Sequence, residues 1–234
     1  MKPLKSRNRR LVVPLGSLII ILLALMVFTP ASSQQVRIKG GLNLATMFPR
    51  EKYEHSSITY PLNPGFQVGG AVEMPLSKRF SIEPGLSISS KGYKKKNIQY
   101  TSVLTYTMKT DIHFIYLEVP VLAKATIKKS RKKYYAEAGP YVGLALLGNY
   151  KRETIVENNT QAVTTSDEGK IEWLSGGGDY QRLDYGLMVG AGVEIRSVSF
   201  GLTYGLGLAK NRPDSDSYYH QRNSVIGLSA GYRF

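Results

Sequence analysis

The sequence predicts an all-β chain in which eight antiparallel strands form an up-and-down barrel that crosses a membrane. Three observations lead to this prediction. Eight stretches alternate apolar residues with small or polar ones at a period of two, which is the side-chain period of a strand. The connections between them are alternately long and short, as in barrels with long loops on one side of the membrane. The last stretch, 224–234, carries Tyr232 and Phe234 on its apolar face, where an interfacial aromatic girdle is expected.

The first 33 residues predict a cleavable signal peptide. Five of the first ten residues are Lys or Arg, residues 11–28 are mostly apolar, and Ala31-Ser32-Ser33 offers a cleavage site before Gln34. The rival interpretation is an uncleaved signal anchor, because the apolar core is long. No later stretch is apolar over 18 residues, so residues 34–234 are expected to cross the membrane as one barrel domain.

The eight predicted strands follow one another along the exported part of the chain. In the first, Val36 and Ile38 face one way, and Arg37 and Lys39 face the other. Most stretches are close to the roughly 9–11 residues that cross a bilayer at a tilt. The alternating stretches are residues 36–44, 66–74, 80–88, 115–123, 134–146, 183–195, 198–208 and 224–234.

Three short turns and four long loops are predicted to join these strands. We expect the short turns and both chain termini to face the periplasm, and the long loops to face the medium. The short turns are residues 77–79, 128–133 and 196–197. The long loops are residues 47–63, 92–110, 148–182 and 210–221.

Three prolines within the predicted strands count against the barrel. Pro84, Pro120 and Pro140 each lack an N–H, and a closed barrel has no free edge where that loss is harmless. We therefore expect bulges or weak points of the hydrogen-bond ladder at these positions.

Composition and charge narrow the classes of partner. The chain has no cysteine, which excludes a disulfide scaffold and a cysteine metal site. Its net charge is +14, yet the basic runs 94–96 and 128–133 fall on opposite sides of the membrane, whereas nucleic-acid binding needs one coherent basic face. We expect the phosphates of outer-membrane lipid and lipopolysaccharide as partners and no nucleic acid. The alternative is that both basic runs are solvated turns without a specific partner.

Several segments resemble the PorT-type outer membrane β-barrel (porin-like) family of Gram-negative bacteria. The segments that carry the resemblance are KGGLNLA, PGFQVGGAVEMPLSKRFSIEPGLSISSKGYK, YLEVPVLAK and AGPYVGLAL. The resemblance implies the fold and the outer membrane, without one activity, and some relatives are associated with protein secretion across that membrane. The end of the chain also resembles the C-terminal signal of such barrels in Tyr232 and Phe234, which implies the barrel-assembly machinery as a partner during insertion.

The inward faces of the predicted strands carry many charges. Buried charges need partners, and an eight-stranded barrel leaves room for side chains and little else, so we interpret these charges as a structural network. Glu73 and Glu83 would lie opposite each other across the 77–79 turn, and such a pair could instead act as acid and base. The predicted set is Arg37, Lys39, Glu73, Glu83, Glu118, Lys124, Glu137, Asp184, Glu194 and Arg233.

Catalytic and cofactor chemistry finds little support in the sequence. His55, His113 and His220 lie in or beside the long loops and could belong to a surface lipid-hydrolysing site, although no spacing supports it. No histidine pair has metal-ligand spacing, and no glycine-rich loop joins a strand to a helix, so no metal, nucleotide or other cofactor is expected. The sequence therefore predicts a non-enzymatic barrel with a structural, binding or assembly role. An accessory component of protein secretion is the alternative, and a surface lipid-modifying enzyme is the third hypothesis.

Cleavage of the predicted signal peptide after Ser33 is directly measurable. The small residues of the Ala31-Ser32-Ser33 site motivate this prediction. Intact-mass analysis of the protein from outer membranes is expected to show Gln34 as the first residue. A chain that keeps Met1 would support the signal anchor instead.

Overall fold

The structure is a computed structural model that describes residues 34–47, 56–101, 103–158, 160–173, 180–209 and 222–234. The chain divides into residues 1–34 and residues 35–234, and the description below concerns the second unit. The predicted signal peptide and the predicted 210–221 loop lie outside the described residues. Among the residues described, no helix is long and apolar enough to cross a membrane.

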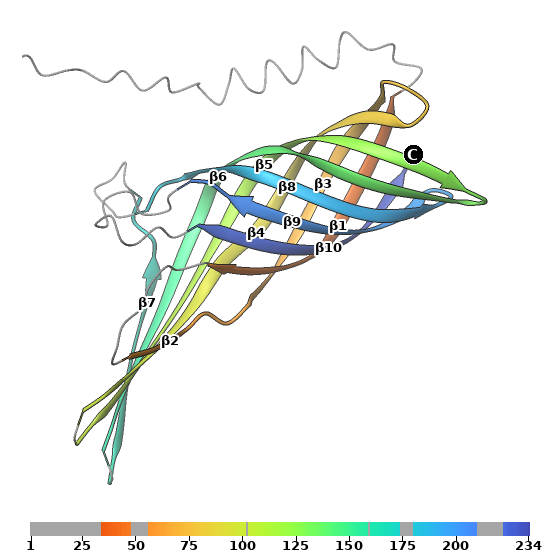
Figure 1. The fold of residues 1–234 in the computed structure, drawn as a ribbon. Coiled ribbons are helices and arrows are strands. Elements are labelled where there is room, and N and C mark those ends of the chain that lie inside the picture. Colours follow the sequence, from red (N-terminus) through yellow and green to blue (C-terminus); the bar gives the residue numbers. More distant parts are fainter. Residues whose placement is uncertain (1–33, 48–55, 102, 159, 174–179, 210–221) are drawn as a thin grey trace, which may run out of the picture. The chain divides into compact units, whose positions relative to one another are not determined.

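Eight strands form a closed antiparallel ring (Figure 1), which confirms the predicted fold class. The ring order is β1-β3-β4-β5-β6-β8-β9-β10, and β10 pairs back with β1. Each strand therefore neighbours the preceding and following ring strands in the chain, as an up-and-down barrel requires. The ring strands are β1 (Gln35–Met47), β3 (Asn63–Pro75), β4 (Phe80–Tyr100), β5 (Thr105–Lys129), β6 (Lys132–Glu157), β8 (Leu183–Ile195), β9 (Val198–Gly207) and β10 (Asn223–Arg233).

The outer face of the ring is aliphatic and exposed. Ten of its large apolar side chains have relative exposures between 46% and 66%, far more than a water-soluble sheet leaves on one continuous face. This band is the surface that lipid covers, because a membrane barrel alternates apolar side chains outward and polar ones inward. Residues of the band include Val36, Ile38, Leu42, Phe66, Val68, Leu187, Val189, Phe200, Leu202 and Leu228.

The first and last strands close the ring. Their ladder runs from Arg37 opposite Arg233 to Met47 opposite Asn223. The backbone N–H of Phe234 adds a hydrogen bond of 3.0 Å to the Val36 carbonyl. The rings of Tyr232 and Phe234 meet edge to face with centroids 5.1 Å apart, and both are exposed on the outer face. The last strand thus seals the barrel and presents its two aromatics outward.

The three predicted short turns are present. Residues 76–79 separate β3 from β4, residues 130–131 separate β5 from β6, and residues 196–197 separate β8 from β9. The last two are two-residue connections whose first residues, Ser130 and Arg196, have φ angles of 58° and 57°. Two-residue hairpin turns need a positive φ at this position.

Two of the predicted long loops are wrong, because most of residues 92–110 and 148–182 form strands. β4 continues to Tyr100, β5 begins at Thr105, β6 continues to Glu157, and β7 (Ala162–Lys170) pairs with the end of β6. The predicted 47–63 loop likewise contains β2 (Ser56–Thr59), which pairs with β4. Beyond the membrane both faces of a strand are wet, so these Thr- and Tyr-bearing strands lack the apolar alternation that identifies the others.

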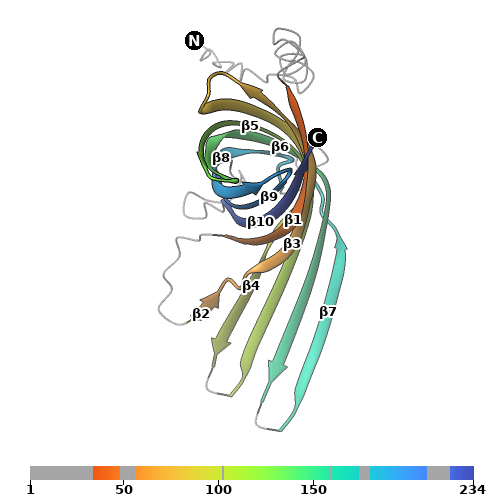
Figure 2. The ribbon, with the colours of Figure 1, turned by 90° about the vertical axis from the view of Figure 1, so that its right-hand side faces the viewer.

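These extra segments build a sheet that projects from one end of the ring. Figure 2 shows β4, β5 and β6 running on past the other ring strands, with β7 beside β6. In this projecting sheet the strand order is β2-β4-β5-β6-β7. The start of β1 and the end of β10 lie at the other end of the ring, together with the three short turns.

The strand prolines weaken the ladder without shifting it. Between β4 and β5 the pairing stops at Pro84 opposite Val121 and resumes in the same register at Ser87 opposite Glu118. Between β5 and β6 the pairing stops at Pro120 opposite Tyr141 and resumes in the same register at Ala123 opposite Ala138. The prolines therefore create local gaps, as expected of residues without an N–H, and the alternative expectation of a bulge at them is wrong.

A bulge does occur farther along β6. Ile115 lies opposite Leu147, whereas Tyr116 lies opposite Ala145, so Leu146 is the extra residue. Leu146 and Leu147 are consequently both exposed. The bulge reverses which β6 residues face outward, and it decides which charges share a face in the projecting sheet.

Changing Phe234 to Asp is expected to block insertion into the membrane. A carboxylate at this exposed outer position replaces an aromatic at the lipid interface beside the seam that closes the ring. Cell fractionation and heat-modifiable migration on gels measure the result, with Phe234→Tyr as the matched control that keeps an aromatic. Normal insertion of the Asp variant would contradict this role.

Candidate functional site

The lumen near the short turns holds a network of ion pairs. Arg37 on β1 reaches carboxylates from three other strands, at 2.9 Å from Glu73, 3.8 Å from Glu83 and 3.0 Å from Glu194. Lys124 on β5 lies 2.9 Å from Glu73 and 3.3 Å from Glu83. Arg37, Glu83, Lys124 and Glu194 are all buried, so each charge depends on the others for solvation.

The remaining predicted charges of this end lie around the same network. Arg233 lies 2.8 Å from Glu194, and Lys39 lies 3.9 Å from Glu83. Glu137 is buried on β6 directly opposite Lys124 in the ladder. Glu73 and Glu83 share Lys124 between them, an arrangement that favours the structural interpretation over an acid and base pair, because the same cation occupies the space between both carboxylates.

A second buried cluster lies farther along the lumen. The Lys91 ammonium pairs with Glu118 and lies 3.3 Å from Asp184, and it sits 4.3 Å from the centre of the Tyr141 ring. Asp184 also accepts hydrogen bonds of 3.3 Å from the Tyr141 hydroxyl and from Asn223. The structure thus brings the predicted Glu118 and Asp184 together on a cation that the sequence analysis missed.

Lys91 was recoverable from the sequence. The inward positions of the predicted 80–88 strand are odd-numbered, and extending them past Ser89 reaches Lys91 and then Tyr93. The predicted strand ended at residue 88, so the inward position at Lys91 was not included. Continuing the alternation by two residues would have supplied the missing countercharge.

Glycines on β8 and β9 make room for a large side chain from the neighbouring strand β6. A Cβ at Gly201 would lie 2.7 Å from the Tyr135 hydroxyl, and one at Gly192 would collide with the same group. Tyr135 in turn lies under Lys124, whose ammonium is 4.6 Å from its ring centre, and under Arg37 at 5.9 Å. The small residues of β8 and β9 therefore accommodate the side chains that fill the lumen.

Aromatic side chains form a cluster where the projecting sheet begins. Phe114 is their centre, with ring centroids 5.9 Å from Tyr116, 5.8 Å from Trp173 and 5.7 Å from Tyr180. The Arg182 guanidinium stacks 5.0 Å from the centre of the Trp173 ring. The buried members of this aromatic cluster are Tyr93, Ile112, Phe114, Tyr116, Ala145 and Ile171, with Tyr60, Tyr150, Trp173 and Tyr180 packed against them.

Within the described part of the chain, His113 belongs to no catalytic constellation. His113 lies on the outer face, with Nε2 3.0 Å from Oδ1 of Asp111. His55 and His220 lie outside the described residues. Across the residues that the structure describes, no group of three or more His, Asp or Glu side chains could hold a metal ion.

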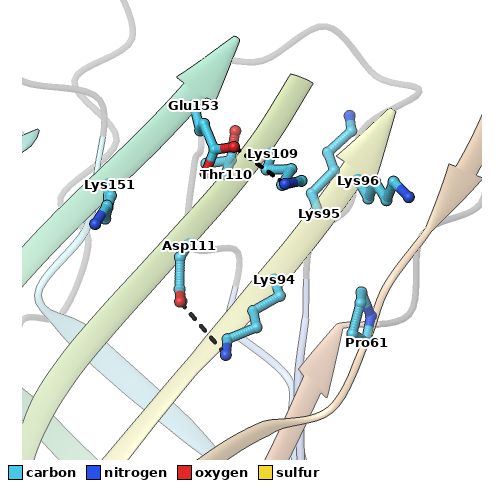
Figure 3. Close-up of a pocket in the computed structure, with 9 residues that line it drawn as sticks. All are labelled: Pro61, Lys94, Lys95, Lys96, Lys109, Thr110, Asp111, Lys151 and Glu153. Atoms are coloured by element: carbon cyan, nitrogen blue, oxygen red, sulfur yellow. Dashed lines mark hydrogen bonds and ion pairs between the residues drawn. The ribbon is translucent and has the colours of Figure 1, made fainter. Parts of the chain in front are cut away.

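The outer face of the projecting sheet gathers charged side chains from three strands (Figure 3). Lys94 lies 3.5 Å from Asp111, and Lys109 lies 3.1 Å from Glu153. These pairs are partly exposed, so each contributes little to stability. They line a hollow together with further residues; the full lining is Pro61, Lys94, Lys95, Lys96, Lys109, Thr110, Asp111, Lys151 and Glu153.

The closed ring, its lipid-facing band and its charged lumen define an integral membrane β-barrel. The chain belongs to the family described as outer membrane protein beta-barrel domain, whose model matches residues 30–211. This membership assigns the protein to the outer membrane. A search of curated proteins finds no match.

Three solved outer-membrane proteins are similar to the chain at low identity. The attachment invasion locus protein Ail of Yersinia pestis is 14% identical, with a TM-score of 0.38, and the match covers 86% of this chain and 99% of that one. Neisserial surface protein A is 13% identical, with a TM-score of 0.42, over 85% and 97% of the two chains. OprG of Pseudomonas aeruginosa is 12% identical, with a TM-score of 0.40, over 86% and 96%.

Replacing Lys91 by Met is expected to lower the free energy of unfolding by about 3–5 kcal/mol, because Glu118 and Asp184 would stay buried without their cation. Urea titration of the refolded barrel, followed by Trp173 fluorescence, measures this loss. Lys94→Met is the matched control, since its side chain is 38% exposed, and about 0–1 kcal/mol is expected there. Equal effects of the two changes would contradict the proposed importance of the buried cluster.

Proposed function

We propose that this protein is an integral outer-membrane barrel with a structural, binding or assembly role and no catalytic chemistry. The observation that carries the proposal is the filled lumen. Two ion clusters and an aromatic cluster occupy the interior of an eight-stranded ring, which is just wide enough for side chains. Solutes then have no path through the barrel, and recognition falls to the surfaces outside it.

The projecting sheet is the surface best suited to recognition. It extends the rigid ladder of β4, β5 and β6 beyond the lipid-facing band, and it carries many charged side chains on strands instead of loops. In our proposal the signal peptide is cleaved after Ser33, both termini face the periplasm, and this sheet faces the medium. The short turns at the end that holds the termini support this orientation, because outer-membrane barrels keep short turns on the periplasmic side.

The partners we propose follow from the same surfaces. Lipid covers the aliphatic band, and lipopolysaccharide surrounds the base of the projecting sheet. The barrel-assembly machinery would recognise the last strand during insertion, through the outward aromatics Tyr232 and Phe234.

A secretion accessory is a second candidate, favoured by the resemblance to PorT-type barrels and by one edge of the projecting sheet. Among the described residues, β7 pairs on one side only, with β6, and its nine residues leave the other edge available to a partner strand. Crosslinking from this edge in whole cells, followed by partner identification, separates the two candidates. Capture of secretion components through β7 would favour the accessory role.

A surface lipid-modifying enzyme is the third candidate, and the Asp111–His113 contact is its only support. The pair lies on the outer face near the lipid level, yet none of the described Ser or Thr residues lines the hollow beside His113. Lipid analysis of cells that carry His113→Ala tests it, and an altered lipid A or phospholipid profile would favour an enzyme.

The refolded barrel is expected not to conduct ions as an open pore. Planar-bilayer recording should give silence or rare small flickers, because buried ion pairs and aromatic side chains fill the lumen. The opposite expectation comes from the inward glycines along β8 and β9, since a wall without side chains could leave a water-filled path through the lumen. Stable, stepwise, ohmic openings of nanosiemens size would refute the filled lumen. They would also refute the proposal that recognition falls to the surfaces outside the barrel.

A further inference from the structure

Four lysines of the projecting sheet share one outward face. Lys94 and Lys96 lie on β4, Lys109 lies on β5, and Lys151 lies on β6. The ladder places Lys94 opposite Asp111 and Lys96 directly opposite Lys109, and it places Asp111 opposite Lys151. The β6 bulge at Leu146 is what brings Lys151 to this face, because it reverses the inward and outward alternation beyond it.

This lysine face continues the lipid-facing face of the same strands. On β5 the outward residues run from the aliphatic Leu117 and Ile115 through His113 and Asp111 to Lys109. Asp111, and with it the opposing Lys94 and Lys151, lies four residues beyond Ile115, about 13 Å along the strand. A tilt of about 40° reduces this to roughly 10 Å of height. Lysine stems can bend back toward the apolar edge, so their ammonium groups reach the headgroup layer.

The charges of this face are not balanced. Asp111 and Glu153 neutralise Lys94 and Lys109 at 3.5 and 3.1 Å. Lys96 lies directly across the ladder from Lys109, and since Glu153 pairs with Lys109, Lys96 is the cation of the two that has no carboxylate partner among the described residues. Lys151 is exposed and, among the described residues, forms no ion pair with Asp111 of β5 or Glu168 of β7, although both lie opposite it in the ladder. The hollow lined by these side chains therefore suits an anion with more than one negative charge.

We infer that this lysine face is a docking site for the phosphorylated headgroup of the outer-leaflet glycolipid, with the phosphates of lipid A between Lys96, Lys109 and Lys151. The inference rests on the proposed orientation, in which the projecting sheet faces the medium. Continuity with the lipid-facing band favours a lipid over a soluble polyanion, because the acyl chains would lie on Ile115, Leu117 and Leu147 below the site. The site would fix the depth and rotation of the barrel in the outer leaflet.

The decisive experiment measures binding of lipid A in mixed detergent micelles to the refolded full chain. Phosphorylated lipid A is expected to bind, and lipid A without phosphates is expected to bind far more weakly. The double variant Lys96→Gln with Lys151→Gln leaves both ion pairs intact and should weaken binding about 30-fold. The matched control Lys128→Gln with Lys129→Gln removes the same charge at the opposite end and should bind like the parent. Heat-modifiable migration on gels verifies that each variant folds. If the double variant does not fold, Lys96→Gln alone is used, and it is expected to weaken lipid A binding about fivefold.

Three outcomes would overturn the inference. They are equal binding of the two lipids, equal loss in the two double variants, or preferential binding of a soluble sulfated polysaccharide that the site variant abolishes. Orientation is tested separately, since the chain has no native cysteine. A single cysteine at Thr160 in the β6–β7 turn should react with an impermeant thiol reagent on whole cells. Failure of that labelling would refute the proposed orientation, whereas labelling without phosphate-dependent binding would refute the lipid site alone.

Discussion

The whole structure depends on the need to pair every backbone polar group that faces lipid. Eight strands meet this need only as a ring, so the first and last strands of the barrel must find each other across nearly 200 residues. Their eleven-pair ladder and the hydrogen bond from Phe234 to Val36 accomplish this. Once the ring is closed, its diameter is fixed by the strand number, and every inward side chain must fit within it.

The small lumen explains why the inward residues form interlocking sets. Charges can occupy it because each cation reaches carboxylates from several strands, as Arg37 and Lys91 do. Tyr135 can occupy it because Gly192 and Gly201, on the next two strands, have no side chains where its ring lies. A ring filled in this way tolerates replacement poorly, and it leaves the outside of the barrel as the place where function can vary.

The sequence predicted the ring and much of its lumen because a lipid-facing strand has one apolar and one polar face. The same pattern failed at residues 92–110 and 148–182, where both faces of β4, β5 and β6 meet water and no alternation is required. It also failed at Leu146, because a bulge leaves two consecutive leucines exposed, and sequence alternation alone does not distinguish that from a strand that ends. The lysine face depends on both of these features, so the sequence analysis identified only its 94–96 run and left out Lys109 and Lys151.

The most direct test of this account is the pairing of β1 with β10. Leu42 lies opposite Leu228, so cysteines at these positions should form a disulfide on mild oxidation of the membrane-inserted barrel, since opposite strand residues have the separation that a disulfide needs. The cysteine-free chain makes the result unambiguous, and cysteines at Ile38 and Leu228, four residues out of register, should stay reduced. A crosslink in the offset pair, or none in the opposite pair, would contradict the closed eight-stranded ring.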